Sequence, residues 1–223
     1  MNKSNIRISL IIPAHNEADN ISAVLSVTSQ AKEVDEIIVV ADACQDNTAE
    51  VAKQFKVKVI ERKKTQGKGS AMIAGVEESS GEIIMFADAD LENLTTRHIS
   101  QVLNPVTSGR AVMSIGLRDR VFGLGALIPK IYPMYAIGGE RAMTREFFNS
   151  LPKNKNILDF GIETVMNYYA KKNKLKVSYP VLKNLHQVIK EKKYGLWQGF
   201  SDRLKLMSQV RKARKIMRHK NSF

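Results

Sequence analysis

The chain has 223 residues, 43% of them hydrophobic, which is enough to bury one core and to form a single domain over residues 1–223. A formal net charge of +13 favours an anionic partner, such as a nucleotide, a phosphorylated acceptor, an acidic membrane surface or nucleic acid. One cysteine excludes an internal disulfide, no run reaches the roughly 20 apolar residues of a membrane-spanning helix, and the N-terminus lacks the pattern of a signal peptide, so a cytoplasmic protein is expected.

Short β-branched segments alternate with helical patterns along the first 90 residues. Strands are expected at residues 6–13, 35–42, 56–62 and 82–90, with helices at 17–30, 47–55 and 67–80. Buried strands that are continuous apolar runs between helices are typical of a mostly parallel sheet with helices on both faces. The connections are short, so the sequence predicts an α/β fold without a domain boundary before about residue 110.

The pattern is less regular beyond residue 110. We expect a strand at residues 109–117, an apolar flap from Val121 to Gly139, a turn at "IGGE", helices at 144–151 and 161–172, a strand at 176–181 and a basic helix near the end. The predicted organisation is therefore a regular α/β half (1–110), a less regular half (111–195) and a basic C-terminal helix (196–223).

Polar clusters follow three of the predicted strands. They read "PAHNE" (13–17), "ADACQDNT" (41–48) and "DAD" (88–90), and a fourth cluster, "QGKGS", opens the helix after the third strand. In open parallel sheets, ligands bind where strands end at their carboxyl edge. The sequence therefore predicts one binding site at this edge.

The "DAD" cluster places two carboxylates, Asp88 and Asp90, at a strand end. Hard carboxylate oxygens suit Mg²⁺ or Mn²⁺, with substrate phosphates completing the coordination shell. Such an ion would neutralise charge on a departing diphosphate. The alternative is a pair of solvated turn aspartates, because Asp is common in turns.

The sequence lacks the motifs of several other kinds of ligand site. The chain has no G-x-x-x-x-G-K-[ST] phosphate loop and no G-x-G-x-x-G after the first strand, which argues against an NTPase and a nicotinamide dehydrogenase. Neither C-x-x-C nor H-E-x-x-H occurs, so a zinc site is not expected.

Four motifs carry a family resemblance. In this order and spacing, "SLIIPAHNEADNI", "EIIVVADACQDNT", "GKGSAMIAGV" and "EIIMFADADL" resemble the nucleotide-binding half of family 2-type glycosyltransferases with the GT-A fold. Further on, "GGERAMTREFF", "FGIET" and "HQVIK" more loosely resemble the acceptor half of glucosyl-3-phosphoglycerate synthases and related retaining enzymes. The first resemblance covers about 90 residues, and the second is partial. Together they imply a nucleotide-sugar-binding half at residues 1–110 and an acceptor half at residues 111–195.

The resemblance implies roles for the donor side of the site. The uridine pocket would be lined by Pro13, Ala14 and Glu17, and Asp42 would accept from the uracil ring N–H. The family run usually has two adjacent acidic residues here, but this chain has Ala41 in the first place, so the base contact rests on Asp42. Asp42 could instead cap the helix that begins near Asp46.

The resemblance also implies roles around the diphosphate. Lys68 would lie near the nucleotide or its diphosphate, Asp88 would touch ribose or metal-bound water, Asp90 would bind the catalytic metal, and His186 matches the third metal ligand. Lys68 as an ordinary exposed lysine and His186 as a packed histidine are the alternatives.

The acceptor half offers fewer residues. Gly139, Glu140, Arg141 and Arg145 are candidates for acceptor binding, and the two arginines, four residues apart, could share a helix face and hold an anionic group. Inverting relatives carry a carboxylate base near the acceptor hydroxyl, and Asp159 and Glu163 are the nearest candidates here. Glu163 is a candidate catalytic residue, or lies on a solvated helix face. The lack of a clear acidic pair, together with "GGER", favours retention.

These features predict a metal-dependent hexosyltransferase that uses a nucleoside-diphosphate sugar of the UDP-glucose type and an anionic or lipid-linked acceptor. A sugar-phosphate nucleotidyltransferase is the first rival, but "PAHNEADN" lacks its glycine-rich signature. A nucleic-acid-binding protein would explain the charge, yet aromatic residues make up only 7% and are not interleaved with the basic ones, so no nucleic-acid partner is expected. The sequence leaves a homodimer open.

The basic charge is concentrated near the C-terminus. Between residues 183 and 220 there are twelve Lys or Arg and two acidic residues. An apolar stripe runs along the same segment through Trp197, Phe200, Leu204, Met207 and Val210. This pattern is typical of a helix in an anionic membrane interface, and equally of a helix packed on its own domain.

Overall fold

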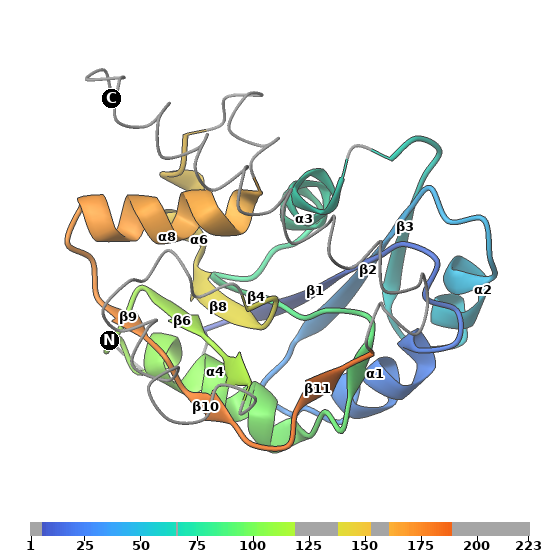
Figure 1. Cartoon of the computed structure of the whole chain (residues 1–223), viewed down its shortest axis with the longest axis horizontal. Coiled ribbons are helices and arrows are strands. Elements are labelled where there is room, and N and C mark those ends of the chain that lie inside the picture. Colours follow the sequence, from blue (N-terminus) through green and yellow to red (C-terminus); the bar gives the residue numbers. More distant parts are fainter. Residues whose placement is uncertain (1–5, 66, 119–137, 153–160, 189–223) are drawn as a thin grey trace, which may run out of the picture.

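The computed structural model describes residues 6–65, 67–118, 138–152 and 161–188. Its centre is a seven-stranded sheet in the order β3-β2-β1-β4-β8-β6-β9 (Figure 1). The strands are β1 (Ile8–Ala14), β2 (Glu36–Asp42), β3 (Lys58–Arg62), β4 (Ile83–Phe86), β6 (Met113–Ile115), β8 (Arg141–Thr144) and β9 (Val177–Ser178). Only β8 among them runs antiparallel to its neighbours, which confirms the mostly parallel sheet.

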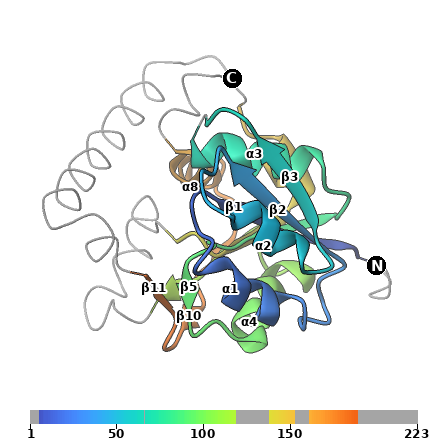
Figure 2. The same cartoon turned by 90° about the vertical axis from the view of Figure 1, so that its right-hand side faces the viewer.

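Helices cover both faces of this sheet (Figures 1 and 2). One face carries α1 (Ile21–Thr28), α2 (Thr48–Lys53) and α4 (Thr96–Thr107), and the other carries α3 (Lys68–Glu77), α6 (Arg145–Asn149) and α8 (Ile162–Lys172). The alternation of side chains along β1 divides the core accordingly. Leu10 and Ile12 pack with the α1 and α4 side, whereas Ile11 packs with the α3 and α8 side.

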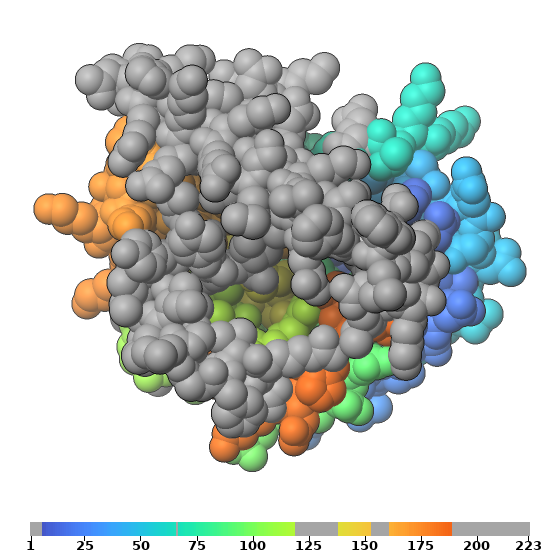
Figure 3. Space-filling view, in the orientation of Figure 1, coloured from blue at the N-terminus to red at the C-terminus, as the bar shows by residue number. Residues whose placement is uncertain are grey.

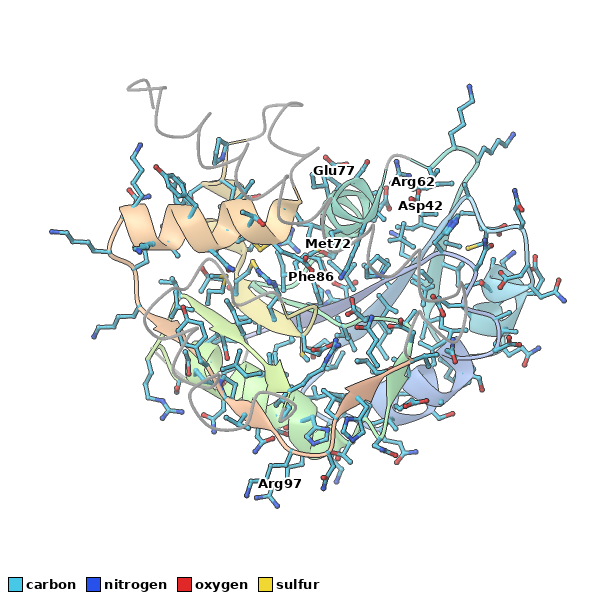
Figure 4. The ribbon with its side chains drawn as sticks, in the orientation of Figure 1. Asp42, Arg62, Met72, Glu77, Phe86 and Arg97 are labelled. Atoms are coloured by element: carbon cyan, nitrogen blue, oxygen red, sulfur yellow. The ribbon has the colours of Figure 1, made fainter. Side chains whose placement is uncertain are left out.

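The core on the α3 and α8 side joins α3 to the sheet. Met72 of α3 and Phe86 of β4 are almost fully buried in it and point toward one another (Figure 4). On the opposite face, Arg97 of α4 points away from the protein (Figure 4). Apolar packing therefore fixes α3 over β1 and β2, and with it the residue that begins α3, Lys68.

Two small strand pairs extend over the carboxyl edge of the main sheet. β5 (Leu91–Glu92) pairs antiparallel with β11 (His186–Gln187), and β7 (Leu117–Arg118) pairs parallel with β10 (Val181–Leu182). The backbone N–H of Val188 also donates to the carbonyl of Asp90 at 3.0 Å. The last described residues thus lie beside the "DAD" segment, almost 100 positions away in sequence.

The predicted elements of the first half are confirmed, and so are the helices near residues 144–151 and 161–172. The strand predicted at 109–117 is divided into β6 and β7, and the one at 176–181 into β9 and β10. The predicted basic helix at 196–223 and residues 121–137 of the predicted flap lie outside the described residues. None of the helices within the described part of the chain is long and apolar enough to cross a bilayer.

Gly75→Ala is expected to lower the free energy of unfolding by about 1–3 kcal/mol, because a Cβ at this position of α3 would overlap Ile11 Cγ2 and lie 3.2 Å from Val40 Cγ2. Helix propensity alone would favour alanine by about 1 kcal/mol. Gly69→Ala is the matched control in the same helix, because its Cβ would meet Ile162 at an ordinary 3.5 Å. Urea unfolding measures both, and a stabilised Gly75→Ala would show that α3 is packed less tightly on the sheet.

Candidate active site

A cavity of about 320 Å³ lies at the carboxyl edge of the sheet, where the sequence predicts the site. Its walls come from the ends of β1, β2 and β4, the start of α3 and the end of β11. The lining residues are Pro13, Ala14, His15, Glu17, Asp42, Thr65, Gly67, Lys68, Ala71, Asp88, Ala89, Asp90, Gln187 and Val188. The structure therefore brings together every residue predicted on the donor side: Pro13, Ala14, Glu17, Asp42, Lys68, Asp88 and Asp90.

Asp88 is buried between two cations. Lys68 Nζ lies 2.6 Å from its Oδ1, and one guanidinium nitrogen of Arg118 lies 3.1 Å from its Oδ2. Burial opposes ionisation of the carboxyl group, but the charges and hydrogen bonds of Lys68 and Arg118 outweigh it and hold the pKa of Asp88 below its usual value. Asp88 is therefore an ionised, fixed carboxylate and not a solvated turn residue.

Lys68 is shared by two acidic residues. Its ammonium lies 3.0 Å from Glu163 Oε1 as well as 2.6 Å from Asp88. Burial favours the neutral amine, but the charges of Asp88 and Glu163 raise the pKa of Lys68 above its ordinary value. Lys68 follows Gly67, whose φ of +85° suits glycine, and this turn points the start of α3 at the cavity. The Lys68 side chain is 43% exposed, but its ion pairs with two acidic residues distinguish it from an ordinary surface lysine.

Glu163 lies in the first turn of α8, and its side chain is 17% exposed. The helix begins after Gly161, at a φ of +83°. The contact between Glu163 and Lys68 links α8 to α3 across 95 residues of sequence. This position excludes the alternative in which Glu163 belongs to a solvated helix face, and its catalytic role stays a prediction. The other candidate base, Asp159, lies outside the described residues.

Asp90 differs from Asp88 in having no ion pair with any described residue. Its carboxylate accepts two hydrogen bonds from the Gln187 amide, at 2.8 and 2.9 Å. Burial raises the pKa of Asp90, and the negative charges of Asp88 and Glu17 raise it further against the effect of Gln187. The carboxylate therefore lies in a negative environment that a cation would relieve.

The two carboxylates offer hard oxygen ligands, which fit Mg²⁺ or Mn²⁺. The described residues contain no group of three or more His, Cys, Asp or Glu arranged to hold a metal ion by themselves. Ligands from a bound phosphate would have to complete the shell, which is usual for Mg²⁺. The donor set thus fits an ion that arrives with a phosphorylated substrate.

His186 is not among the residues that line this cavity in the described structure. It lies on β11 opposite Glu92, is half-buried, and its buried Nδ1 has no hydrogen-bond partner among the described residues. Successive strand residues face opposite sides, so the cavity receives its neighbour Gln187 instead. Metal ligation by His186 stays a prediction.

Asp42 is buried at the end of β2, only 4% exposed. Its side chain accepts a hydrogen bond from Thr65 Oγ1 at 2.7 Å and pairs with Arg62 at 3.3 Å. Figure 4 shows Asp42 and Arg62 next to each other beside α3. The alternative role as a helix cap is not seen, because Asp46 accepts from the backbone N–H of Thr48 at the start of α2. Asp42 instead connects β2 to the β3–α3 loop, which projects from the surface on the side away from α8 (Figure 3).

Arg118 is a site residue that the sequence did not reveal. It ends β7, and its guanidinium contacts Glu140 twice, at 3.1 and 2.6 Å, Asp88 at 3.1 Å and Gln187 Oε1 at 2.6 Å. Burial raises the pKa of Glu140, as does the charge of Asp88, and the opposing effect of Arg118 does not cancel them. Arg118 thus joins Glu140, from the predicted acceptor half, to the "DAD" segment.

Gly139 lies directly against Asp88. A Cβ at this position would overlap the Asp88 carboxylate, so only glycine lets the chain pass here without moving that side chain. Gly139 and Glu140 therefore lie next to the donor-side carboxylates. Acceptor binding by these two residues stays a prediction.

The expectation that Arg141 and Arg145 share a helix face is wrong. Arg141 begins β8 and is fully buried, where it donates to the Gly138 carbonyl at 2.7 and 3.0 Å. Arg145 begins α6, and its guanidinium donates to Ser79 Oγ at 2.7 Å and to the Val76 carbonyl at 3.2 Å. Arg145 lies next to Glu82, just before β4 begins, whereas Arg141 pairs with Phe86 at the end of β4. The two arginines are therefore at opposite ends of the sheet. The chain turns from strand to helix between them, which separates side chains that a continuous helix would bring together.

The cavity, its carboxylates and its lysine can be compared with known proteins. The model of glycosyl transferase family 2 matches residues 9–169. The chain belongs to this family. The match covers all the strands and helices that carry the donor-side residues, and it extends into α8.

Three curated relatives of this family 2 chain illustrate the range of the matches. Glycosyltransferase AglE of Haloferax volcanii is 41% identical over 91 residues, which are 37% of this chain and 30% of that protein. Dolichol-phosphate mannosyltransferase of Pyrococcus furiosus is 38% identical over 94 residues, 40% of this chain and 27% of the relative. Glucosyl-3-phosphoglycerate synthase of Mycolicibacterium paratuberculosis is 27% identical over 185 residues, which are 67% of this chain and 56% of that protein. The chain thus spans at most 56% of the length of these relatives.

Solved structures of glucosyl-3-phosphoglycerate synthase from Mycobacterium tuberculosis share the fold. One superposes with a TM-score of 0.74 at 22% identity, covering 95% of this chain and 81% of that one. Another, which contains Mn²⁺, UDP and glucosyl-3-phosphoglycerate, has a TM-score of 0.72 at 22% identity. The superposition covers 95% of this chain and 78% of that one. The GT-A fold expected for this family 2 chain is confirmed.

Proposed function

We propose that this family 2 chain transfers a hexose from a nucleoside-diphosphate sugar of the UDP-glucose type to an anionic or lipid-linked acceptor. The observation that carries the proposal is the group of Asp88, Asp90 and Lys68 on the wall of one cavity at the carboxyl edge of the sheet. The mycobacterial synthase has been solved with UDP-glucose, Mn²⁺ and phosphoglyceric acid, which supports this choice of donor and of metal. The dolichol-phosphate relative supports a lipid-linked acceptor as the second choice.

The proposed cofactor is Mg²⁺ or Mn²⁺, held by Asp90 with Asp88 nearby and with His186 as a further candidate ligand. When bound, such an ion supplies Lewis-acid stabilisation of the diphosphate leaving group. Lys68 would take part of the same negative charge, since its ammonium is already aimed into the cavity. Pro13, Ala14 and Glu17 would line the uridine pocket, and Asp42 would accept from the base.

We place the acceptor on the side of Gly139, Glu140 and Arg141, beyond Asp88. Glu163 is proposed as a positioning residue that fixes Lys68, because the two side chains are 3.0 Å apart. Retention is the proposed stereochemistry. Glu140 and Glu163, the described carboxylates on the acceptor side, are both engaged by cations, which leaves neither ready to act as a base.

UDP is expected to stabilise the protein only when a divalent ion is present, because Asp88, Asp90 and Glu17 would repel a bare diphosphate. At 100 times its dissociation constant, a ligand adds about 2.7 kcal/mol, which corresponds to a rise in Tm of roughly 5–10 °C. Thermal shift with Mn²⁺, with Mg²⁺ and with EDTA measures this, and GDP is the matched control for the base. UDP binding of equal strength in EDTA would contradict the assignment of the metal.

The experiment that tests the proposed function is product analysis. The donor that gives the largest thermal shift is incubated with Mn²⁺ and candidate acceptors, and products are identified by mass spectrometry and their anomeric configuration by NMR. A hexose added to the acceptor with release of UDP supports the proposal. Release of pyrophosphate from a nucleoside triphosphate would instead identify the rival, a sugar-phosphate nucleotidyltransferase.

We also propose a cytoplasmic location, with reversible binding of the basic segment 196–223 to an anionic membrane surface. Attraction of about 1 kcal/mol per basic residue near the surface would be enough to hold the enzyme there. Vesicles containing anionic lipid are expected to sediment the full chain at low salt and to release it as salt rises. A chain truncated after residue 195 is the control, and equal recovery with neutral and anionic vesicles would contradict membrane binding.

A further inference from the structure

The Gln187 side chain lies between the two halves of the site. Its Nε2 donates to both oxygens of Asp90, at 2.8 and 2.9 Å, and its Oε1 accepts from Arg118 at 2.6 Å. The residue lies on β11, is half-buried and lines the cavity. Among the described residues, the Gln187 amide is thus the polar group that donates to both Asp90 oxygens.

The chemistry of the two neighbours fixes the orientation of this amide. A guanidinium has only donors, so the oxygen of the amide must face Arg118. An ionised carboxylate has only acceptors, so the NH₂ group must face Asp90. A flipped amide would place like groups together at both ends, and the orientation in the structure is therefore the one that both contacts require.

This arrangement has a consequence for any cation at Asp90. Nε2 is nearly equidistant from the two Asp90 oxygens, so it occupies the position that an ion held by both oxygens would take. The amide oxygen faces Arg118 and the NH₂ group faces Asp90, so in this orientation Gln187 offers no oxygen ligand beside the Asp90 carboxylate. Binding of an ion by both Asp90 oxygens therefore requires Gln187 to move.

We propose that Gln187 is a positioning residue that holds the Asp90 carboxylate in the metal-free enzyme and is displaced when the divalent ion binds. The inference rests on the proposed function, which supplies the ion. Displacement would also remove one contact from Arg118, which holds Asp88 and Glu140. Binding of the ion would thereby change the contacts of Arg118, which pairs with Glu140 on the acceptor side of the site.

The test is the affinity of the 223-residue chain for Mn²⁺ alone, measured by the EPR signal of free Mn²⁺. Gln187→Ala and Gln187→Met remove the amide, and the methionine variant keeps the volume. Because hydrogen bonds to a charged group no longer have to break, both variants are expected to bind Mn²⁺ about tenfold more tightly. Gln101→Ala on α4 is the control, and metal-free melting curves show that the variants are folded.

A second pair of variants locates the effect. In an Asp90→Asn background, Gln187→Met is expected to give no gain in affinity, because the carboxylate that it releases is absent. Weaker or unchanged Mn²⁺ binding in the single variants would overturn the inference and would identify Gln187 as a ligand or a bystander. A gain that persists with Asp90→Asn would also overturn it. Failure of wild type and variants alike to bind Mn²⁺, even with UDP, would count against the proposed function as well.

Discussion

Asp90→Asn is expected to lower kcat about 1,000-fold for transfer from the best nucleotide sugar. The substitution keeps the shape of the side chain but removes the charge that would hold the divalent ion, and Lewis-acid stabilisation of a leaving group contributes several kcal/mol in the transition state. The fold should remain intact, because burial and the neighbouring carboxylates already disfavour the ionised form of Asp90 in the free protein. Steady-state kinetics with saturating donor measures the loss.

The matched control for this variant is Glu92→Gln, which also removes one negative charge two residues away. Glu92 is exposed on β5 and does not line the cavity. Its substitution should leave kcat within a factor of about two, because an exposed charge at this distance is screened by solvent. Equal losses in the two variants would indicate a general effect of charge and not a role at the leaving group.

Asp42→Ala is expected to raise the KM for the donor roughly 10- to 100-fold with a much smaller effect on kcat. A contact with the base is made equally in the ground and transition states, so its loss weakens binding without slowing the chemical step. The variant also removes the acidic partner of Arg62 and leaves that residue its hydrogen bond to Ser70, so Asp42→Asn, which keeps the volume, should be measured beside it. Thr65→Val is the comparison variant, because it keeps the Asp42 carboxylate and removes the hydrogen bonds that the Thr65 hydroxyl donates to Asp42 and accepts from the Gly67 N–H.

The comparison of these two variants tests the division of roles within the site. Asp90 is assigned to the leaving group and Asp42 to the base, and the kinetic defects should differ accordingly. If both substitutions lowered kcat to the same extent and left KM unchanged, that division would be wrong.

The first half of the fold could be predicted because its signals are local and strong. The runs that became β1, β2 and β4 are continuous and apolar, and each is followed by a polar cluster at the carboxyl edge. The edge of a parallel sheet brings such clusters together whatever lies between them in sequence. Asp42, Lys68, Asp88 and Asp90 were therefore placed correctly in one cavity.

The second half depends on contacts that leave no periodic signal. β7, β10 and β11 have two residues each, which is too short for an alternating pattern. Arg118 and Gln187 reach the site through these strands, from 30 and 97 residues beyond their acidic partners. The error over Arg141 and Arg145 has the same origin, because β8 is a four-residue strand that continues directly into α6.

The most direct test of a metal-dependent nucleotide-sugar transferase is the release of UDP from UDP-glucose by the purified full chain. We predict that release with Mn²⁺ is well above the rate of the Asp90→Asn variant and falls to that rate when EDTA removes the ion. Equal rates for wild type and Asp90→Asn, or release that EDTA does not change, would contradict the account.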